Sequence, residues 1–227
     1  MPNILITGGS DGIGRALVDH YTHAGGTVFA TGRRKKADVS PALPPSCHYI
    51  AADLTQDLTA IQAALPETLD LAILNAGAGR VAPPAEHGPE SIKAMVALNT
   101  TAPLLLAQAL YPRLKASRGT LVFIGSTAAR GAHKDFAVYA ATKAALDGAY
   151  RSLRLEWEGA VTVLMIHPGP TATAMHDKAG LPQIAARKLF TNPATVAATI
   201  AKAAARGKSR RLGLGYTLRH ALAGGRR

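Results

Sequence analysis

The sequence predicts an α/β fold in which a doubly wound parallel β-sheet carries helices on both of its faces. Short runs of apolar, β-branched residues recur along the chain, and the segments between them are long enough for a helix. Within each run consecutive residues are apolar, as in strands that are buried on both faces. The chain has 227 residues, 48% of them hydrophobic, which suffices for one domain with a substantial core.

The expected strands and helices alternate along the chain. Strands are expected at residues 4–7, 27–31, 49–51, 71–74, 120–124 and 161–166, and helices at residues 14–20, 91–114, 137–157 and 194–205. The last helix has recognisable ends, because Asn192 can cap it, Pro193 suits its first turn and Gly207 follows it. We therefore expect a single domain over residues 1–227, in which about residues 190–227 form a C-terminal helix and a basic tail.

The chain is strongly basic, with a formal net charge of +12 and a pI near 10.2. Such a balance favours contact with any polyanion, including nucleic acid, an acidic membrane face or a phosphorylated cofactor. Much of the excess positive charge lies in the last 26 residues, from Lys202 onward, which contain eight lysines and arginines and no carboxylate. No aromatic platform or zinc-finger spacing accompanies these charges, so we favour a solvated surface over a nucleic-acid site.

Membrane proteins, disulfide-rich proteins and metalloproteins are disfavoured. No stretch approaches the roughly 20 consecutive apolar residues of a spanning helix, and the N-terminus has no basic leader. Cys47 is the only cysteine, so it can form no intramolecular disulfide, and no second soft metal ligand lies near it. We expect a cytoplasmic protein that contacts no membrane and holds no metal.

A glycine-rich loop follows the first expected strand and leads into the first expected helix. It reads Thr7-Gly8-Gly9-Ser10-Asp11-Gly12-Ile13-Gly14. Its glycines at positions 8, 12 and 14 allow a tight turn and a close approach of the backbone to a pyrophosphate, whose charge is favoured at a helix N-terminus. The spacing differs from the more common G-x-G-x-x-G. The place of the loop between a strand and a helix favours cofactor binding over a plain turn.

This Thr-Gly-x-x-x-Gly-Ile-Gly pattern resembles that of the short-chain dehydrogenase/reductase family, in its single-domain branch. The resemblance covers most of the chain and weakens beyond about Met175. Its matching residues, in chain order, are the loop from Thr7, Asp53, Asn75-Ala76-Gly77, Asn99, Ser126, Tyr139, Lys143 and Pro168-Gly169. The resemblance implies a Rossmann-type fold and hydride transfer between a nicotinamide cofactor and a carbonyl or alcohol substrate.

The residues after the second expected strand indicate which nicotinamide cofactor is preferred. This strand ends in Gly32-Arg33-Arg34-Lys35-Lys36, where an NAD-selective protein usually places an acidic residue for the ribose 2′-hydroxyl. A guanidinium can instead pair with a 2′-phosphate. Arg33, with Arg34 as second candidate, therefore favours NADP(H) over NAD(H), and the alternative is an exposed basic loop.

Further cofactor contacts are implied by the resemblance. Asp53 resembles the aspartate that meets the adenine, with Leu54 as its backbone neighbour, although Asp53 could also be a helix N-cap. Asn75, Ala76 and Gly77 resemble the family's Asn-Asn-Ala-Gly turn, except that Leu74 replaces the first asparagine. The remaining contacts are expected from Pro168, Gly169, Thr171 and Thr173, with Thr173 as the candidate for the nicotinamide carboxamide.

The candidate catalytic residues begin with Tyr139 and Lys143, which stand four apart and so share one face of a helix. A tyrosine has a pKa of roughly 10, and a nearby ammonium is expected to lower it. Ser126 lies 13 residues before Tyr139, and Asn99 lies 40 before it, both at the family's spacing.

By this resemblance Tyr139 is the general acid and base, and Ser126 binds the substrate oxygen. Lys143 lowers the tyrosine pKa and binds the nicotinamide ribose, while Asn99 positions a water that relays protons to Lys143. His167 could also face the substrate, but a packed histidine is favoured.

The substrate itself is not specified beyond a small carbonyl or alcohol compound. Its selection is expected in residues 79–87, 128–136 and 174–190, the last of which resembles the family's mobile loop. The resemblance also implies a homodimer or homotetramer formed through helices 91–114 and 137–157. An alternative function is an NADP-sensing regulatory protein whose basic tail engages nucleic acid or an acidic partner, although such a protein needs no proton relay.

Overall fold

The computed structural model describes residues 1–131, 133–181 and 185–212, and within them it contains a seven-stranded parallel sheet. The strands are β1 (Asn3–Ile6), β2 (Thr27–Gly32), β3 (His48–Ala51), β4 (Leu71–Leu74), β5 (Thr120–Ile124), β6 (Thr162–His167) and β7 (Arg210–Arg211). Their order across the sheet is β3-β2-β1-β4-β5-β6-β7. The six strands expected from the sequence are all present, and β7 is an addition to them.

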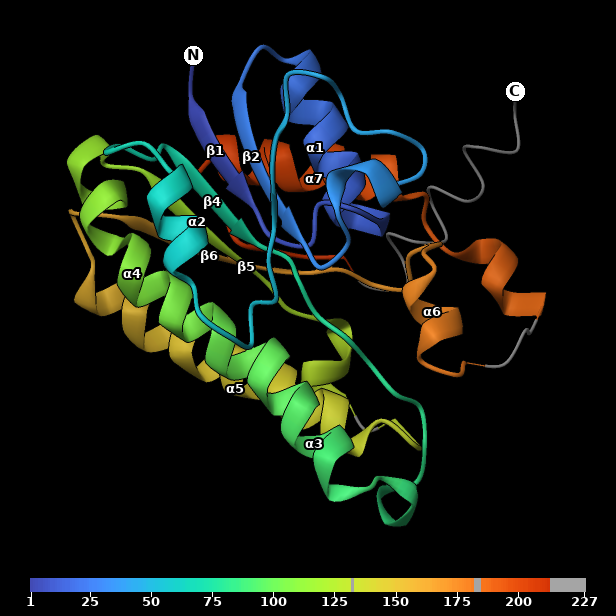
Figure 1. Cartoon of the computed structure of the whole chain (residues 1–227). Coiled ribbons are helices and arrows are strands. Elements are labelled where there is room, and N and C mark those ends of the chain that lie inside the picture. Colours follow the sequence, from blue (N-terminus) through green and yellow to red (C-terminus); the bar gives the residue numbers. More distant parts are fainter. Residues whose placement is uncertain (132, 182–184, 213–227) are drawn as a thin grey trace.

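Helices cover both faces of this sheet, as Figure 1 shows. The main ones are α1 (Gly12–His23) and α7 (Pro193–Ala205) on one face, and α2 (Thr59–Ala64), α4 (Ala102–Ser117) and α5 (Ala137–Glu156) on the other. The side chains of β1 alternate accordingly. Ile4 and Ile6 join the core beneath α1 and α7, whereas Leu5 joins the core beneath α4. The predicted doubly wound Rossmann-type architecture is thereby confirmed.

The helix expected at residues 91–114 is interrupted by a wider turn. The structure has α3 (Pro89–Val96), a π-helical segment η3 (Ala97–Thr101) and then α4. Such π turns are uncommon and occur often at functional sites. Here the turn contains Asn99, which is 0% exposed. By length and composition alone the continuous stretch Pro89–Ser117 could cross a membrane, and its α4 part packs against β4 and β5.

The predicted ends of the last helix, α7, are confirmed. Asn192 caps α7, because its Oδ1 accepts from the N–H of Ala194 at 2.8 Å. Gly207 follows the helix with a positive φ of 59°. Much of the basic tail lies outside the described residues, among them Arg219, Arg226 and Arg227.

Several short elements had no recognisable signal in the sequence. They are α6 (Met175–Lys178) and the 3-10 turns η1 (Lys36–Asp38), η2 (Pro84–Glu86), η4 (Thr127–Arg130) and η5 (Ala185–Leu189). The strand order reverses between β1 and β4, and the loops that follow β1, β4, β5 and β6 meet at the carboxyl edge of the sheet. In open α/β sheets this edge is where ligands bind.

Candidate functional site

The glycine loop after β1 has backbone conformations and close contacts that favour glycine over any other residue. Gly8 and Gly12 have positive φ values of 68° and 55°. A Cβ on Gly14 would collide with the carbonyl oxygen of Gly8 and would lie 2.5 Å from the amide nitrogen of Asn75. The loop is therefore a narrow cradle of bare backbone at the N-terminus of α1, as a bound phosphate group requires.

Thr7 and Asn75 join this loop to the turn after β4. The Thr7 hydroxyl accepts from the N–H of Asn75 at 2.9 Å and from the N–H of Ala76 at 3.0 Å. The amide of Asn75 donates in return to the carbonyl of Thr7 at 3.0 Å. Asn75 thus links the two central strands beside the cradle, although Leu74 stands where the family has its first asparagine.

Asp11 caps α1 and contacts the segment that follows β6. Its Oδ1 accepts from the N–H of Gly12 at 2.7 Å, and its Oδ2 is 2.8 Å from Nζ of Lys178 in α6. Burial alone would raise the pKa of Asp11, but the hydrogen bond and charge of Lys178 hold it below its usual value. A Cβ on Gly12 would lie 3.0 Å from Cγ2 of Thr173. The structure therefore brings Thr173 against the glycine loop.

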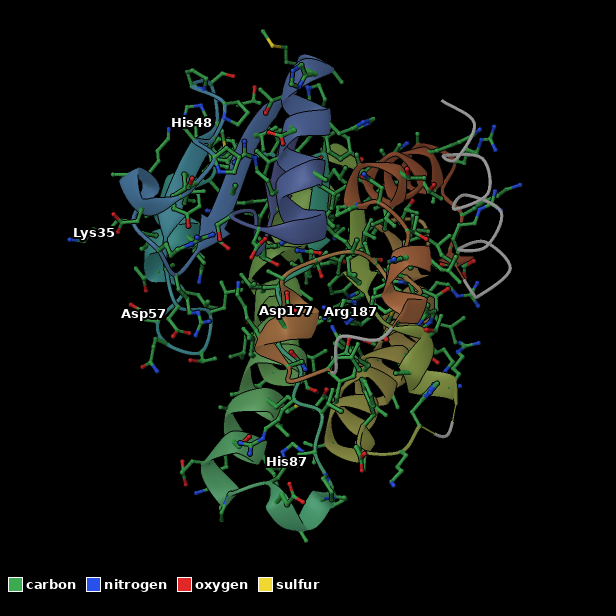
Figure 2. All side chains as sticks on the ribbon, turned by 90° about the vertical axis from the view of Figure 1, so that its right-hand side faces the viewer. Lys35, His48, Asp57, His87, Asp177 and Arg187 are labelled. Carbon is green, nitrogen blue, oxygen red and sulfur yellow. The ribbon has the colours of Figure 1, made fainter. Side chains whose placement is uncertain are left out.

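The two arginines after β2 lie beside the same loop. Nη2 of Arg34 donates to the carbonyl of Ser10 at 2.9 Å, and Tyr49 donates to the carbonyl of Arg34 at 3.0 Å. Arg33 is close enough to Asp53 to lower the pKa of that carboxyl, although hydrogen bonds from Thr55 are the larger cause. Lys35 points away into solvent (Figure 2).

Asp53 and Leu54 follow β3 at the same edge. Oδ1 of Asp53 accepts from the N–H and the hydroxyl of Thr55 at 2.9 and 2.8 Å, so Asp53 forms a side-chain turn. It is not the N-cap of α2, because Leu58 holds that place. Leu54 is buried in the core, so only its backbone faces the site. The alternative role of Asp53 as a helix cap was therefore wrong.

Tyr139 and Ser126 meet in the interior of the site. Tyr139 is 7% exposed on α5, and its phenol lies near enough to the Ser126 side chain for that hydroxyl to lower the pKa of Tyr139. Ser126 follows β5 and caps η4, where its hydroxyl accepts from the N–H of Ala128 at 3.1 Å. Gly79 of the loop after β4 lies against the Tyr139 ring, with 3.5 Å between its Cβ position and Cδ2.

Lys143 lies one turn further along α5 and is 4% exposed. Its ammonium donates to the carbonyl of Ile124 at 3.0 Å. Burial lowers the pKa of Lys143 to about 8. A Cβ on Gly77 would lie 3.2 Å from this Nζ and 3.2 Å from Oδ1 of Asn99, so the bare glycine leaves room for both groups.

The expected lowering of the tyrosine pKa by Lys143 is not what the structure has. Burial raises the pKa of Tyr139 above its usual 10, and only the hydrogen bond with Ser126 opposes this. Lys143 is not among the groups that shift it. The physical reason is desolvation, which disfavours the charged form of a fully buried phenol. Desolvation therefore outweighs the Coulomb attraction from which a lowered pKa was expected.

The side chain of Asn99 is fully engaged by its neighbours. Its Nδ2 donates to the carbonyl of Ala78 at 2.8 Å and to Oγ1 of Thr142 at 3.1 Å, while its Oδ1 accepts from the N–H of Ala78 at 2.9 Å. Asn99 therefore fixes the loop after β4 through its amide.

The segment after β6 completes the edge of the site. The hydroxyl of Thr171 turns inward and donates to the carbonyl of Gly169 at 2.9 Å, and the carbonyl of Pro168 accepts from Thr127. Further along, Asp177 and Arg187 form an ion pair of 2.8 Å (Figure 2). Lys178 reaches the glycine loop, and the carbonyl of Ala179 accepts from Val81 at 2.7 Å. α6 is therefore tied to loops on both sides.

His167, for which a packed position was favoured, is buried behind Ser126, but sequence reasoning missed the residues that it contacts. His167 at the end of β6 contacts the carbonyl of Ser126, and it also contacts Asp147 of α5, which binds Arg130. One signal was available, because Asp147 lies four residues after Lys143 and so shares its helix face. The contact of His167 with both residues could not be read from the sequence.

This arrangement offers defined chemical capabilities. The phenol of Tyr139 and the hydroxyl of Ser126 can both bond one substrate oxygen, with a buried ammonium nearby. The cradle beside them has room for a phosphate-bearing ligand. No group of three or more His, Cys, Asp or Glu side chains in the described residues could hold a metal ion.

Comparisons with known proteins agree with this geometry. Residues 2–184 match the family described as short chain dehydrogenase. An uncharacterized oxidoreductase of Escherichia coli, YciK, is 33% identical over 191 residues, which are 78% of this chain and 76% of that protein.

Two solved structures are similar over nearly the whole chain. A short-chain dehydrogenase of Sphingobium yanoikuyae in complex with NADPH has a TM-score of 0.82 at 26% identity, covering 100% of this chain and 93% of that one. A 3-ketoacyl-(acyl-carrier-protein) reductase of Brucella melitensis with NADH has a TM-score of 0.84 at 21% identity, covering 95% and 98%, and supports the fold alone. With its fold, its glycine cradle and a family match over most of its length, the chain belongs to the short-chain dehydrogenase/reductase family of oxidoreductases.

Proposed function

We propose that the protein, as a single domain, is an NADP(H)-dependent oxidoreductase that interconverts a ketone or aldehyde and the corresponding alcohol. One observation carries the proposal. The buried phenol of Tyr139 lies beside the Ser126 side chain, and Lys143 lies one helical turn away. These groups lie at the edge of the sheet where the glycine cradle opens.

The residues of the cradle fit a dinucleotide cofactor. Positions 8, 12 and 14 are bare backbone at the start of α1, where a pyrophosphate needs close approach, and a Cβ at position 14 would collide with the Gly8 carbonyl and distort this loop. Arg33 and Arg34 would hold the 2′-phosphate, and Asp53 and Leu54 would hold the adenine. The nicotinamide half would meet Asn75, Ala76, Gly77, Lys143, Pro168, Gly169, Thr171 and Thr173. When bound, the cofactor supplies or accepts the hydride.

The protein supplies the proton and orients the substrate oxygen. The hydroxyl of Ser126 binds that oxygen as charge develops on it. Tyr139 then donates its phenolic proton, and burial favours the protonated phenol that a reduction needs as its acid. Lys143 would bind the nicotinamide ribose, and Asn99 fixes the loop after β4 that packs against Tyr139 and Lys143.

We propose also that copies of the chain pair through α4 and α5, as expected from the family. Leu105 of α4 is 50% exposed and Leu155 of α5 is 65% exposed, which leaves large apolar side chains on both helices. Light scattering on the purified protein distinguishes a monomer from a dimer or tetramer. We place the protein in the cytoplasm, consistent with its one buried, unpaired cysteine.

The proposal is tested by titrating purified protein with NADPH and NADH and by following NADPH oxidation against aldehydes, ketones and quinones. Tyr139→Phe is expected to lower turnover by about 10³-fold while NADPH binding is retained. Tyr150→Phe is the matched control, because Tyr150 lies on the same helix and its hydroxyl contacts Ser209, away from the site.

The outcomes separate the two candidate functions. Turnover that depends on Tyr139 but not on Tyr150 supports the reductase. Tight NADPH binding without turnover of any substrate favours the NADP-sensing alternative, above all if the protein also binds nucleic acid in a salt-sensitive way. Failure to bind either cofactor overturns the proposal.

A further inference from the structure

A buried histidine lies at the end of β6, directly behind the loop that carries Ser126. His167 is 4% exposed. Its Nδ1 lies 3.0 Å from the carbonyl oxygen of Ser126, and its Nε2 lies 3.1 Å from Oδ1 of Asp147. A carbonyl oxygen can only accept a hydrogen bond, so Nδ1 carries the proton in the first contact. The His167 ring therefore donates to the main chain of Ser126.

The ladder between β5 and β6 explains why a side chain takes this place. Gly125 donates to the carbonyl of Ile166 at 2.8 Å, and Thr127 donates to the carbonyl of Pro168 at 3.2 Å. In a parallel ladder the rung between these two would come from the N–H of residue 168, and proline has none. The ring of His167 supplies a link between the strands where the main chain loses one.

Asp147 connects the histidine to the far end of the Ser126 loop. Its two carboxylate oxygens accept from Nη2 of Arg130 at 3.0 and 2.9 Å. Arg130 is the last residue of η4, and Ser126 is the N-cap of the same turn. The turn is therefore held at its start by His167 and at its end by Arg130, and both bind the same carboxylate.

The carboxylate belongs to the helix that carries the phenol. Asp147 follows Lys143 by four residues and Tyr139 by eight, so the three side chains lie along one face of α5. Asp147 and Lys143 are both buried. Because Asp147 binds His167 and Arg130, the position of the Ser126 loop is fixed relative to Tyr139 by side-chain contacts.

Gly125 gives the histidine its space. A Cβ at this position would lie 2.7 Å from Nδ1 of His167 and 2.9 Å from the sulfur of Met165. The residue before Ser126 must therefore be bare for the ring to reach the Ser126 carbonyl.

We propose that His167 and Asp147 are positioning residues, which hold the Ser126 loop in register with α5 so that the Ser126 hydroxyl meets the Tyr139 phenol and the substrate oxygen together. Both residues act through Ser126 and touch neither substrate nor cofactor. This inference rests on the proposed function, because it assigns these residues to the same reaction.

The electrostatic surroundings are compatible with this role. In the described part of the chain, the charged groups that shift the pKa of His167 are Asp147 of α5 and Arg130 of η4. Burial lowers the pKa of His167, while the Ser126 carbonyl and Asp147 oppose the shift. The neutral tautomer with its proton on Nδ1 keeps the bond to Ser126, whereas a bond from Nε2 to the Asp147 carboxylate needs the charged ring, so only the Ser126 contact persists where His167 is neutral.

The test is a double-mutant cycle between His167→Leu and Ser126→Ala, with kcat, KM and the NADPH dissociation constant measured for each variant. His167→Leu is expected to lower kcat by about 10- to 100-fold with little change in NADPH affinity, because a small displacement of Ser126 spoils the reactive geometry. In the Ser126→Ala background it should lower kcat little further, because the residue through which it acts is already lost.

Two further variants separate positioning from general stability. His167→Asn keeps an N–H near the place of Nδ1 and should restore most of kcat. Val163→Ala removes buried volume from the same strand, where Val163 is 3% exposed, and should lower the unfolding free energy while kcat is kept. Equal losses of kcat in His167→Leu and Val163→Ala, or additive losses with Ser126→Ala, would overturn the proposal.

A second readout does not depend on turnover. The pKa of the Tyr139 phenol is obtained from ultraviolet difference spectra against Tyr139→Phe. The hydrogen bond with Ser126 lowers this pKa, so His167→Leu should raise it, and it should not do so when Ser126 is alanine. An inactive wild type that still shows this shift would overturn the proposed function and keep the positioning role, whereas an unchanged pKa would overturn the role itself.

Discussion

The ammonium of Lys143 lies 3.0 Å from the carbonyl oxygen of Ile124, at the point where β5 ends. This contact joins α5 to the sheet at the level of the site. Lys143 is 4% exposed, and burial lowers its pKa to about 8. The contact with Ile124 therefore compensates only part of the desolvation cost of the Lys143 ammonium, so the contribution of Lys143 to stability depends on pH.

Stability is expected to rise with pH between about 8 and 10 because of Lys143. Its folded pKa of about 8 lies below the ordinary value of 10.5, so the buried ammonium destabilises the fold below pH 8. That cost is relieved as the folded form loses its proton, by about 2–3 kcal/mol over this range. Above pH 10 the raised pKa of Tyr139 acts in the opposite direction.

Urea unfolding of wild type and Lys143→Met between pH 7 and 10 measures this effect. The difference in unfolding free energy should shift in favour of wild type as the pH rises. A difference that stays constant with pH would contradict a lowered pKa for Lys143.

Replacement of either arginine after β2 should weaken NADPH binding selectively. In the proposed cofactor site, Arg33→Ala and Arg34→Ala would each remove a charge-assisted bond to the 2′-phosphate, which corresponds to about 10- to 100-fold in the dissociation constant. The affinity for NADH, which has no such phosphate, should change little. Lys35→Ala is the matched control, because Lys35 belongs to the same basic run and points into solvent. Equal losses for both cofactors would contradict the assignment.

Two glycine-to-alanine substitutions should have opposite effects. Gly14→Ala places a methyl group against the Gly8 carbonyl, so the cradle must open, and both stability and cofactor binding should fall. Gly148→Ala lies within α5 with nothing inside 4 Å of the new Cβ, and should stabilise the fold by about 0.5–1 kcal/mol. Thermal unfolding with and without NADPH measures both. A Gly14→Ala variant that keeps wild-type stability and NADPH affinity would show that the cradle is not closed as described.

Asn99→Asp should destabilise the protein although it preserves size. A carboxylate cannot donate, so the carbonyl of Ala78 and Oγ1 of Thr142 would each lose a partner in a buried place. The expected loss is about 2–4 kcal/mol, because a buried charge is left without compensation. Chemical unfolding at neutral pH gives the value, and turnover should fall with it. A loss below about 0.5 kcal/mol would mean that the Asn99 site is accessible to solvent.

The fold could be predicted largely because its strands are buried on both faces. Runs such as residues 71–74 and 120–124 coincide with β4 and β5, since a continuous apolar run between polar segments has few other stable places. β7 has two residues, Arg210–Arg211, and depends on pairing with β6, so no local signal announced it. The π turn at Asn99 could not be predicted either, because its hydrogen-bond pattern differs from that of an α-helix over only five residues.

The site was predictable where its chemistry is fixed by spacing along one element. Tyr139 and Lys143 share a helix, and the structure buries Tyr139 near Ser126 and Lys143 against the carbonyl of Ile124. Two features of the site could not be predicted, because they depend on how deeply a side chain is buried and on contacts between residues distant in the sequence. The direction of the Tyr139 pKa shift follows from its burial, and the link from His167 to Ser126 joins residues 41 apart.

The central place of β1 determines when the parts of the site can form during synthesis. Its neighbours are β2 and β4, so one edge can pair early while the other waits for residues 71–74 to leave the ribosome. The glycine cradle is secured only when Asn75 reaches Thr7, across 68 residues. Ser126 receives its support later still, when residue 167 emerges. The contacts that join Thr7 to Asn75 therefore lie within the first 75 residues, whereas those that support Ser126 need the chain up to residue 167.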